Sequence, residues 1–416
     1  MPNVLAIHGG EKRVSIERPH YVWPPITERT REAVLRQLEE SISIYDRSGI
    51  IERLENRCAE YHGKKHALLT SSGTAGLHSM FVGADVKEGD EVICPAYTFY
   101  ATVTPLFFTG AVPVLADCTE EGNIDPKDIE KKITGRTKAI VVTHMWGIPG
   151  DMEAIKKIAK EYHLLLFEDG SHAHGALYKG EKVGTCGDAA VLSLQGQKTI
   201  TGGEGGILVT DNDELFYRAL LFGHYNKRCK REIPVDHPLH LFAVTGMGLK
   251  LRIHPLAAAI ADEQFDNLES VLEGRRKTAG RMRNALQGVA GISVPKVGEG
   301  KSPSWYGFVM QYNAEELGGL SIERFFEAVV AEGCKELDRP GSTCPLNLHP
   351  LFQTPEAVFP QYKGRVRYKK GDFPRAEEFH ARSLKLPVWH DPNDNEIVEG
   401  YIEALKKVSK HHGDLL

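Results

Sequence analysis

The sequence predicts an α/β fold in which helices flank a mostly parallel central sheet, followed by a second, smaller α/β domain. Short apolar runs alternate with helical periods between residues 66 and 170, a pattern typical of parallel sheets. The chain has 416 residues, more than one core usually supports. A long helical stretch around residue 260 suits a connection between two domains. We therefore predict an arm over 1–29, a large domain over 30–262 and a small domain over 263–416.

The segments before the sheet predict the arm and two helices. Residues 1–29 show no clear period, which suggests an extended arm lying on the body. From Thr30 onward, apolar residues recur at helical spacing and predict an amphipathic helix. Its apolar stripe consists of Val34, Leu35, Leu38 and Ile42. A second helix over 49–62 is expected to end at Gly63, because glycine readily adopts the left-handed conformation of a C-cap.

Four apolar segments predict the parallel strands: HALLT (66–70), EVICP (91–95), KAIVVTH (138–144) and HLLLFED (163–169). Helices are expected between them, one starting in SGTAGLHSMFVGA and one capped by Asp151. In parallel α/β sheets, ligands bind just beyond the carboxyl ends of strands. We therefore expect Asp169, residues 72–74 and residues 97–99 to lie near one another at one edge of the sheet.

Composition and charge exclude several classes of protein. A net charge of −5 gives no general field that would attract nucleic acid or an anionic membrane. The seven cysteines are scattered and include no CxxC pair, which argues against a disulfide framework and against a zinc site. The N-terminus lacks the long apolar region of a secretory signal, and no stretch approaches the length of a membrane span. We expect a cytoplasmic protein with small-molecule partners and no metal.

Lys198 stands in SLQGQKTITGGEGG, among small and hydroxyl-bearing residues. A single lysine is most often a solvated surface residue. Here the glycines allow the backbone to pass close to a flat ligand. Lysine is also the side chain best suited to forming a Schiff base with a carbonyl.

Three further features are ambiguous when each is taken alone. Asp169 ends a predicted strand, where it either caps a turn or holds a ring nitrogen in its protonated form. TSSGTAGL opens a helix with free N–H groups that suit an anion, although serine and threonine caps are common. The aromatic residues of PAYTFYAT are more often core than cofactor platform. Their order along the chain, followed by Lys198, matches what pyridoxal phosphate requires: a phosphate cradle, a stacking face, an acid and a lysine.

The chain resembles the sugar aminotransferases of the DegT/StrS family, within the fold-type I pyridoxal-phosphate enzymes. The likeness runs from about residue 30 to the C-terminus and is carried by SSGTAGL, GDEVICPAYTFYATV, NIDPKDIEKKIT, RTKAIVVTHMWG, EDGSHAHGA, GDAAVLSL and KTITGGEGG. It implies that Lys198 is the catalytic Schiff-base residue and that Asp169 pairs with the cofactor's ring nitrogen. It also implies that Phe99 stacks on the ring and that His172 lies by the ring hydroxyl.

The resemblance implies further residues at the phosphate and in the substrate pocket. Gly73, Thr74 and Ser193 would hold the phosphate, and Gln195 would face the substrate. Where the family usually has an asparagine that reaches the phosphate of the neighbouring subunit's cofactor, this chain has Lys250 in GLKLR. Lysine can bind phosphate as a point charge. The family's members are dimers with active sites at the subunit interface, so a homodimer is implied.

Other candidate substrate residues lie in two loops. Tyr225, Asn226 and Arg228, in GHYNKRCKR, are candidates for binding a donor carboxylate or another substrate anion, although a basic run is usually a solvated loop. His349, in LNLHPLF, lies where the family has pocket-facing residues.

Three functions remain open from the sequence. The first is an aminotransferase that moves an amino group from glutamine or glutamate to a keto-sugar or keto-cyclitol, because His172 with Gln195 is similar to the branch that includes scyllo-inosose aminotransferases. The second is an elimination or aromatising enzyme similar to aminohydroxybenzoate synthase, from the same branch. The third is a non-catalytic regulatory relative, against which the intact Lys198 argues.

Overall fold

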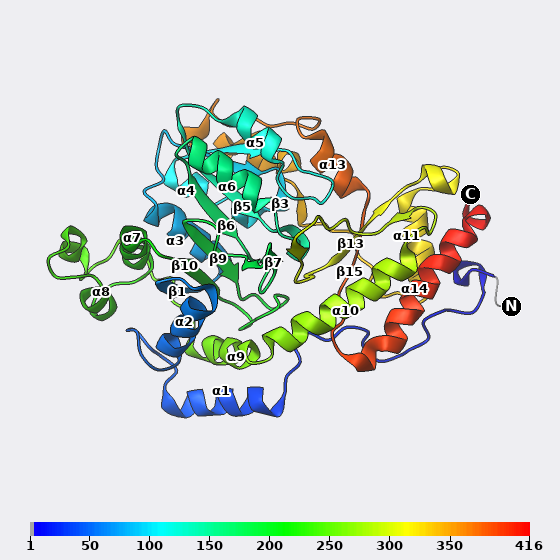
Figure 1. Cartoon of the computed structure of the whole chain (residues 1–416), viewed down its shortest axis with the longest axis horizontal. Helices are drawn as coiled ribbons and strands as arrows, with labels where there is room; N and C mark the ends of the chain where they lie inside the picture. Colours follow the sequence, from blue (N-terminus) through cyan, green and yellow to red (C-terminus); the bar gives the residue numbers. More distant parts are fainter. Residues whose placement is uncertain (1–3) are drawn as a thin grey trace.

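A computed structural model describes residues 4–416 and has a seven-stranded sheet at its centre (Figure 1). The strand order is β1-β10-β9-β6-β5-β2-β4. The strands are β1 (His66–Thr70), β2 (Glu91–Pro95), β4 (Val112–Ala116), β5 (Thr137–Thr143), β6 (Leu165–Asp169), β9 (Ala189–Ser193) and β10 (Gly206–Thr210). Neighbouring strands from β9 to β4 are parallel, whereas β10 is antiparallel to both β1 and β9. The predicted mostly parallel sheet is confirmed.

Helices cover both faces of this sheet. Residues that alternate along the strands divide between the two faces: Leu68 and Val141 belong to one buried cluster, Leu69 and Ile140 to others. The first face packs against α3 (Gly73–Gly83) and α7 (Asp213–Gly223). The second packs against α2 (Gly49–His62), α6 (Met152–Glu161) and α9 (Pro255–Phe265). The result is three layers, with the sheet between two layers of helices. Because β6 and β9 are parallel, their carboxyl ends lie at the same edge of the sheet.

A second unit is built around a small antiparallel sheet with the order β11-β13-β15. Its strands are β11 (Ile292–Ser293), β13 (Phe308–Tyr312) and β15 (Ser383–Leu386). Three helices pack on it: α10 (Leu268–Leu286), α11 (Ile322–Ala331) and α14 (Asn395–Lys410). In Figure 1, α10 leads from below the large sheet to this unit, as the helical stretch near residue 260 predicted.

Two segments cross the predicted domain boundaries. Leu346, Phe352 and Tyr362, which lie beyond residue 263, pack into the core of the large unit. Leu5 and Val14 of the arm pack into the core of the small unit. Part of the predicted small domain thus packs with the large unit, and part of the predicted arm packs with the small unit.

The amphipathic helix is present as α1 (Glu28–Glu40), but its apolar stripe faces away from this chain. Leu35, Leu38 and Ile42 are 59%, 48% and 57% exposed. Thr30 and Gln37 are buried instead, and the Thr30 hydroxyl donates to Glu263 Oε2 of α9 at 2.9 Å. The helix ends at Glu40, so Ile42 lies beyond it. Figure 1 shows α1 on the outside of α9.

The remaining elements are short. The strands are β3 (Tyr97–Phe99), β7 (Leu177–Tyr178), β8 (Glu181–Lys182), β12 (Lys301–Ser302) and β14 (Thr343–Pro345), and the helices are α4 (Leu106–Thr109), α5 (Pro126–Lys132), α8 (Lys227–Glu232), α12 (Pro350–Gln353) and α13 (Pro374–Ala381). Across residues 4–416 we find no helix long and apolar enough to cross a membrane. In the same range, no three His, Cys, Asp or Glu side chains come together as metal ligands would.

Candidate active site

Lys198 is buried in the loop between β9 and β10, with 9% of its surface exposed. Its Nζ lies 3.4 Å from the hydroxyl oxygen of Tyr306 and 4.4 Å from the centre of that ring. Burial lowers the pKa of Lys198 to about 8, against the opposing attraction of Asp169, and the charge of Lys385 lowers it further. A large fraction of this amine is therefore neutral near pH 8, which a nucleophilic lysine requires.

Asp169 is held in place at the end of β6 by two hydrogen bonds. The Thr102 hydroxyl donates to Oδ2 at 2.7 Å, and the Ser171 N–H donates to Oδ1 at 3.1 Å. Thr102 lies in a 3-10 helix directly after β3, so residues far apart in sequence meet here. No basic side chain among residues 4–416 forms an ion pair with Asp169. The carboxylate is available to a cationic ligand.

The start of α3 touches the end of β9, where the sequence predicts a phosphate site. Ser72 caps the helix by accepting the Ala75 N–H at 3.0 Å. A side chain at Gly73 would place its Cβ 2.8 Å from the Ser193 Cβ, so only glycine fits between the two segments. Thr74 is exposed beside them. The first N–H groups of a helix have no intrahelical partner, and this end is therefore suited to an anion.

Three nearly parallel rings form one wall of the site. His172 stacks on Tyr306 with centroids 4.1 Å apart and on Trp146 at 5.6 Å. Burial, followed by the charge of Lys198, holds the pKa of His172 well below its usual value, so the ring is neutral. Its Nδ1 is buried without a hydrogen-bond partner. Phe99, at the end of β3, is half-buried and lies against Tyr100 with centroids 4.1 Å apart.

No sequence pattern assigned Tyr306, Trp146 or Thr102 to the site. Trp146 adopts a left-handed backbone with φ 56°, which costs a non-glycine residue about 1–2 kcal/mol. At Gly147, a Cβ would lie 2.8 Å from the Trp305 N, so this loop packs tightly against the segment that carries Tyr306. An aromatic run such as SWYG gave a weak signal, because aromatic residues near a strand are usually core.

The site thus combines a buried lysine, a strand-end aspartate and a helix start suited to an anion. The sequence pattern of the DegT/DnrJ/EryC1/StrS aminotransferase family covers residues 25–405. The chain belongs to this family. It is an aminotransferase, as the likeness of its motifs predicted.

Relatives of this aminotransferase support the assignment over most of its length. It is 31% identical over 426 residues to the L-glutamine:scyllo-inosose aminotransferase of Streptomyces griseus, covering 99% of this chain and 97% of that enzyme. It is 31% identical over 379 residues to the dTDP-3-amino-3,6-dideoxy-alpha-D-galactopyranose transaminase of Aneurinibacillus thermoaerophilus, covering 91% and 94%. The solved structure of an aminotransferase from Psychrobacter cryohalolentis is 25% identical, with a TM-score of 0.84 over 95% of this chain and 100% of that one.

The predicted role of Arg228 in binding a substrate anion is contradicted by its position in the aminotransferase. Its side chain is 1% exposed, and its guanidinium donates to Glu55 at 2.8 Å and to Glu232 at 2.8 Å. The sequence of the basic run GHYNKRCKR does not show which of its basic side chains is buried. Arg228 therefore links α8 to α2 through its ion pair with Glu55.

The other predicted substrate residues lie around the rim of the site. Gln195 is exposed, three residues before Lys198, and its Oε1 accepts the Gln197 N–H at 3.1 Å. His349 Nε2 is 3.0 Å from Cys344 Sγ, and its ring lies edge-on to Tyr100 at 6.3 Å. Because β14 pairs with β3, His349 lies on the side of the site that carries Phe99.

Two predicted residues lie on an exposed loop near the start of α3. Tyr225 and Lys250 are exposed. The backbone next to Lys250 is fixed, because the Ser71 N–H donates to the Leu251 carbonyl at 2.7 Å. The ammonium of Lys250 itself is directed to solvent.

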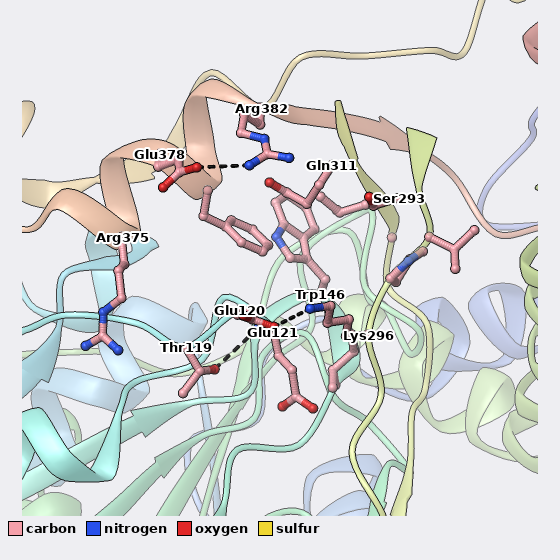
Figure 2. Close-up of a pocket in the computed structure, with 16 residues that line it drawn as sticks. Thr119, Glu120, Glu121, Trp146, Ser293, Lys296, Gln311, Arg375, Glu378 and Arg382 are labelled. Atoms are coloured by element: carbon pink, nitrogen blue, oxygen red, sulfur yellow. Dashed lines mark hydrogen bonds and ion pairs between the residues drawn. The ribbon is translucent and has the colours of Figure 1, made fainter. Parts of the chain in front are cut away.

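A cavity of about 310 Å³ lies between the two units (Figure 2). Trp146 lines it and also stacks on His172, so the indole separates this cavity from the site around Lys198. Figure 2 shows Arg382 paired with Glu378 above the indole. Arg375 and Lys296 also have acidic partners, Asp125 and Glu120. The charged groups of this cavity are thus already neutralised.

Proposed function

We propose that this aminotransferase uses pyridoxal 5'-phosphate to move an amino group from glutamine or glutamate to a keto-sugar or keto-cyclitol. The observation that carries the proposal is Lys198, a buried amine whose pKa is lowered to about 8. The charge of Asp169 acts on it, and this buried side chain forms no ion pair within residues 4–416. A lysine in water would keep its ordinary pKa of about 10.4, whereas burial lowers the pKa of Lys198.

Several features of the structure support this cofactor. The free Nδ1 of His172 can bond the ring hydroxyl, and Asp169 can hold a protonated ring nitrogen. The contact between Gly73 and Ser193 leaves a narrow, polar end for the phosphate, with Thr74 beside it. Phe99 offers an aromatic face. When bound there, the cofactor supplies an electron sink for cleavage of a C–H bond next to an amine.

The residues of the site divide the remaining work. Lys198 Nζ would take a proton from the α-carbon of the donor and give it to the C4′ carbon of the bound cofactor, because its pKa lies near working pH. Asp169, fixed by Thr102, would stabilise positive charge on the ring nitrogen of the bound cofactor. The wall of Tyr306, His172 and Trp146 shields the amine from solvent.

We propose that the acceptor ketone lies between Gln195 and His349. Two observations support this: Gln195 is exposed in the loop that carries Lys198, and His349 follows β14, which pairs with the strand that carries Phe99. Both side chains offer hydrogen bonds to hydroxyl groups. The relative from Streptomyces griseus, named for scyllo-inosose, matches nearly the whole chain and supports a cyclic polyol ketone. The relative named for a dTDP-linked amino sugar supports a nucleotide-linked keto-sugar as the other possible acceptor.

We also propose a homodimer with shared sites. Two groups of exposed apolar side chains support it. The α1 group consists of Leu35, Leu38, Ile42 and Tyr45, and the loop group consists of Val235, Leu241, Phe242, Val244, Met247 and Leu249. Apolar area of this extent on one chain marks an interaction surface. Lys250 directly follows the loop group, and we propose that it, with Tyr225, reaches the phosphate end of the partner's site.

The proposal is tested by a half-reaction. Purified protein supplied with pyridoxal phosphate should show the yellow absorbance band of the bound cofactor, lose it on addition of glutamine or glutamate, and regain it with a ketone such as scyllo-inosose. Lys198→Ala should lower turnover by about 10³-fold. The control is Lys179→Ala, which removes a surface lysine paired with Glu153 and should change nothing. A protein that never binds the cofactor would contradict the proposal.

A further inference from the structure

The loop that carries Lys198 is held from several directions. Within the loop, the Lys198 N–H donates to the Gln195 carbonyl at 2.9 Å, and the Gly202 N–H donates to Leu194 at 3.0 Å. From the N-terminal arm, the indole N–H of Trp23 donates to the carbonyl oxygen of Lys198 at 2.8 Å. This is a direct bond between the arm and the backbone of the reactive residue.

Trp23 is itself packed between residues of the small unit. The guanidinium of Arg275, from α10, lies 4.6 Å from the centre of the Trp23 rings, and His390 packs edge-on against them at 5.3 Å. Arg275 also donates to the hydroxyl of Thr199 at 3.0 Å. The arm and α10 thus hold two consecutive residues of the loop, Lys198 and Thr199.

Arg275 explains why the arm lies there. Its side chain is 1% exposed, and within residues 4–416 it forms no ion pair with a carboxylate. A buried cation without an acidic partner is costly. Its charge is met instead by the face of Trp23 and by the hydroxyls of Thr199 and Tyr21, the latter at 3.3 Å. Two of these three partners come from the arm.

We propose that the N-terminal arm positions the Schiff-base lysine, with Trp23 as the positioning residue that fixes the backbone of Lys198. The inference rests on the proposed function, because Lys198 matters as a reactive amine. Nζ must remain near Asp169 while its surroundings change during turnover, and small displacements of a reacting group are costly in rate. The arm also binds the small unit, so this contact ties movement of that unit to the lysine.

The first experiment measures the loop itself in the cofactor-free full-length chain. Trp23→Phe keeps an aromatic ring over Arg275 and removes the indole N–H donor together with one ring of the indole. Amide hydrogen exchange in a peptide covering residues 198–203 should accelerate about fivefold, because one hydrogen bond that restrains the loop is lost. Thr199→Val, which removes the acceptor of Arg275 from the same loop, should accelerate the same peptide and serves as a second variant if Trp23→Phe does not fold.

The matched control is Trp389→Phe. The Trp389 indole also donates to a backbone carbonyl, that of His20 in the same arm, at 2.6 Å. It does not touch the lysine loop. This variant should lower the melting temperature, as Trp23→Phe should, but leave the exchange of residues 198–203 at the parent rate.

The second experiment uses the cofactor-bound protein. Trp23→Phe should shift the midpoint of the pH titration of the cofactor's absorbance band and lower kcat about tenfold, with little change in KM for the donor. Trp389→Phe should leave both unchanged. The inference is overturned if Trp23→Phe matches the parent in exchange and titration, or if Trp389→Phe alters them equally. If the parent binds no cofactor, the proposed function fails, while the exchange comparison still decides whether Trp23 fixes the loop.

Discussion

The charge on Lys198 results from opposing influences that the structure identifies. Burial favours the neutral amine, Asp169 favours the ammonium, and Lys385 disfavours it. These influences come from three separate elements: the β9–β10 loop, β6 and β15. Each can be changed alone, so the balance can be tested residue by residue.

We predict that the reaction of Lys198 with pyridoxal phosphate has a midpoint near pH 8. The neutral amine reacts, so the rate rises with pH and levels off above the pKa of about 8. Asp169→Asn removes the attraction that raises this pKa and should move the midpoint to lower pH. Lys385→Met removes a repelling charge and should move it to higher pH. Stopped-flow absorbance across pH 6–11 measures all three, and a parent midpoint at the ordinary lysine pKa of about 10.4 would contradict the prediction.

We predict that Lys198→Met stabilises the cofactor-free chain at neutral pH. In the unfolded chain, Lys198 has its ordinary pKa of about 10.4, whereas the folded pKa is about 8. Between these values the unfolded chain binds more protons, so the stability of the parent rises as pH increases from about 8 to about 10. The methionine variant lacks this cost and should be more stable by about 3 kcal/mol at pH 7, with the difference shrinking toward pH 10. Urea unfolding at both pH values measures it; a constant difference would contradict the assignment.

At the level of single residues, the sequence indicated Lys198, Asp169 and His172 because their spacing resembled a family. It did not indicate Tyr306, whose hydroxyl lies beside Lys198 Nζ, because Tyr306 stands on a segment of the small unit. The assignment of Arg228 was wrong because burial of one member of a charged run depends on which way a short helix turns.

Among the elements, α3 and β9 meet in a close contact at the site. Gly73 lies at the first turn of α3, and Ser193 is the last residue of β9. The strand and the helix start can approach this closely only where one residue lacks a side chain.

We predict that Gly73→Ala weakens both the fold and the cofactor's phosphate contact. Its Cβ would lie 2.8 Å from the Ser193 Cβ, so the helix start must move, at a cost of about 1–3 kcal/mol. The matched control is Gly280→Ala in α10, where no atom lies within 4 Å of the added Cβ. That change should stabilise the chain by about 0.5–1 kcal/mol. Melting temperatures and the Kd for pyridoxal phosphate measure both variants; equal behaviour would contradict the role of Gly73.

The strands were predictable as elements, but not all of their directions. The apolar runs of β1 and β10 look alike in sequence, and β10 is antiparallel to both of its neighbours because its connection to β9 is a loop, not a crossover helix. The apolar stripe of α1 was likewise predictable from its spacing. The sequence does not show whether such a stripe packs against the same chain or against another chain.

On the scale of the whole molecule, the stripe of α1 and the loop group are apolar surfaces that remain exposed to water in a single chain. Leu35 and Leu38 face away from α9, and Leu241 is among the most exposed apolar side chains. A second copy of the chain would remove these surfaces from water.

We predict that Leu35→Glu combined with Leu38→Glu produces monomers. Two charges in an apolar interface carry an uncompensated desolvation cost. Turnover should fall with dimer content, because Lys250 is proposed to complete the partner's site. The control is Val330→Glu on α11, which carries a partly exposed side chain of the small unit. Analytical ultracentrifugation measures the mass, and a double variant that remains dimeric and active would contradict the proposed interface.

The sequence by itself determined the fold class and the family, and it singled out Lys198 as the proposed reactive lysine, because strand periodicity and motif order can be read from the chain itself. Only the tertiary structure decided the surroundings that make Lys198 reactive: Asp169 fixed by Thr102, His172 stacked on Tyr306, and the arm bonded to the Lys198 carbonyl through Trp23. Each of these contacts joins segments that are distant in sequence. Burial and charge act through space, so no local pattern of residues contains them.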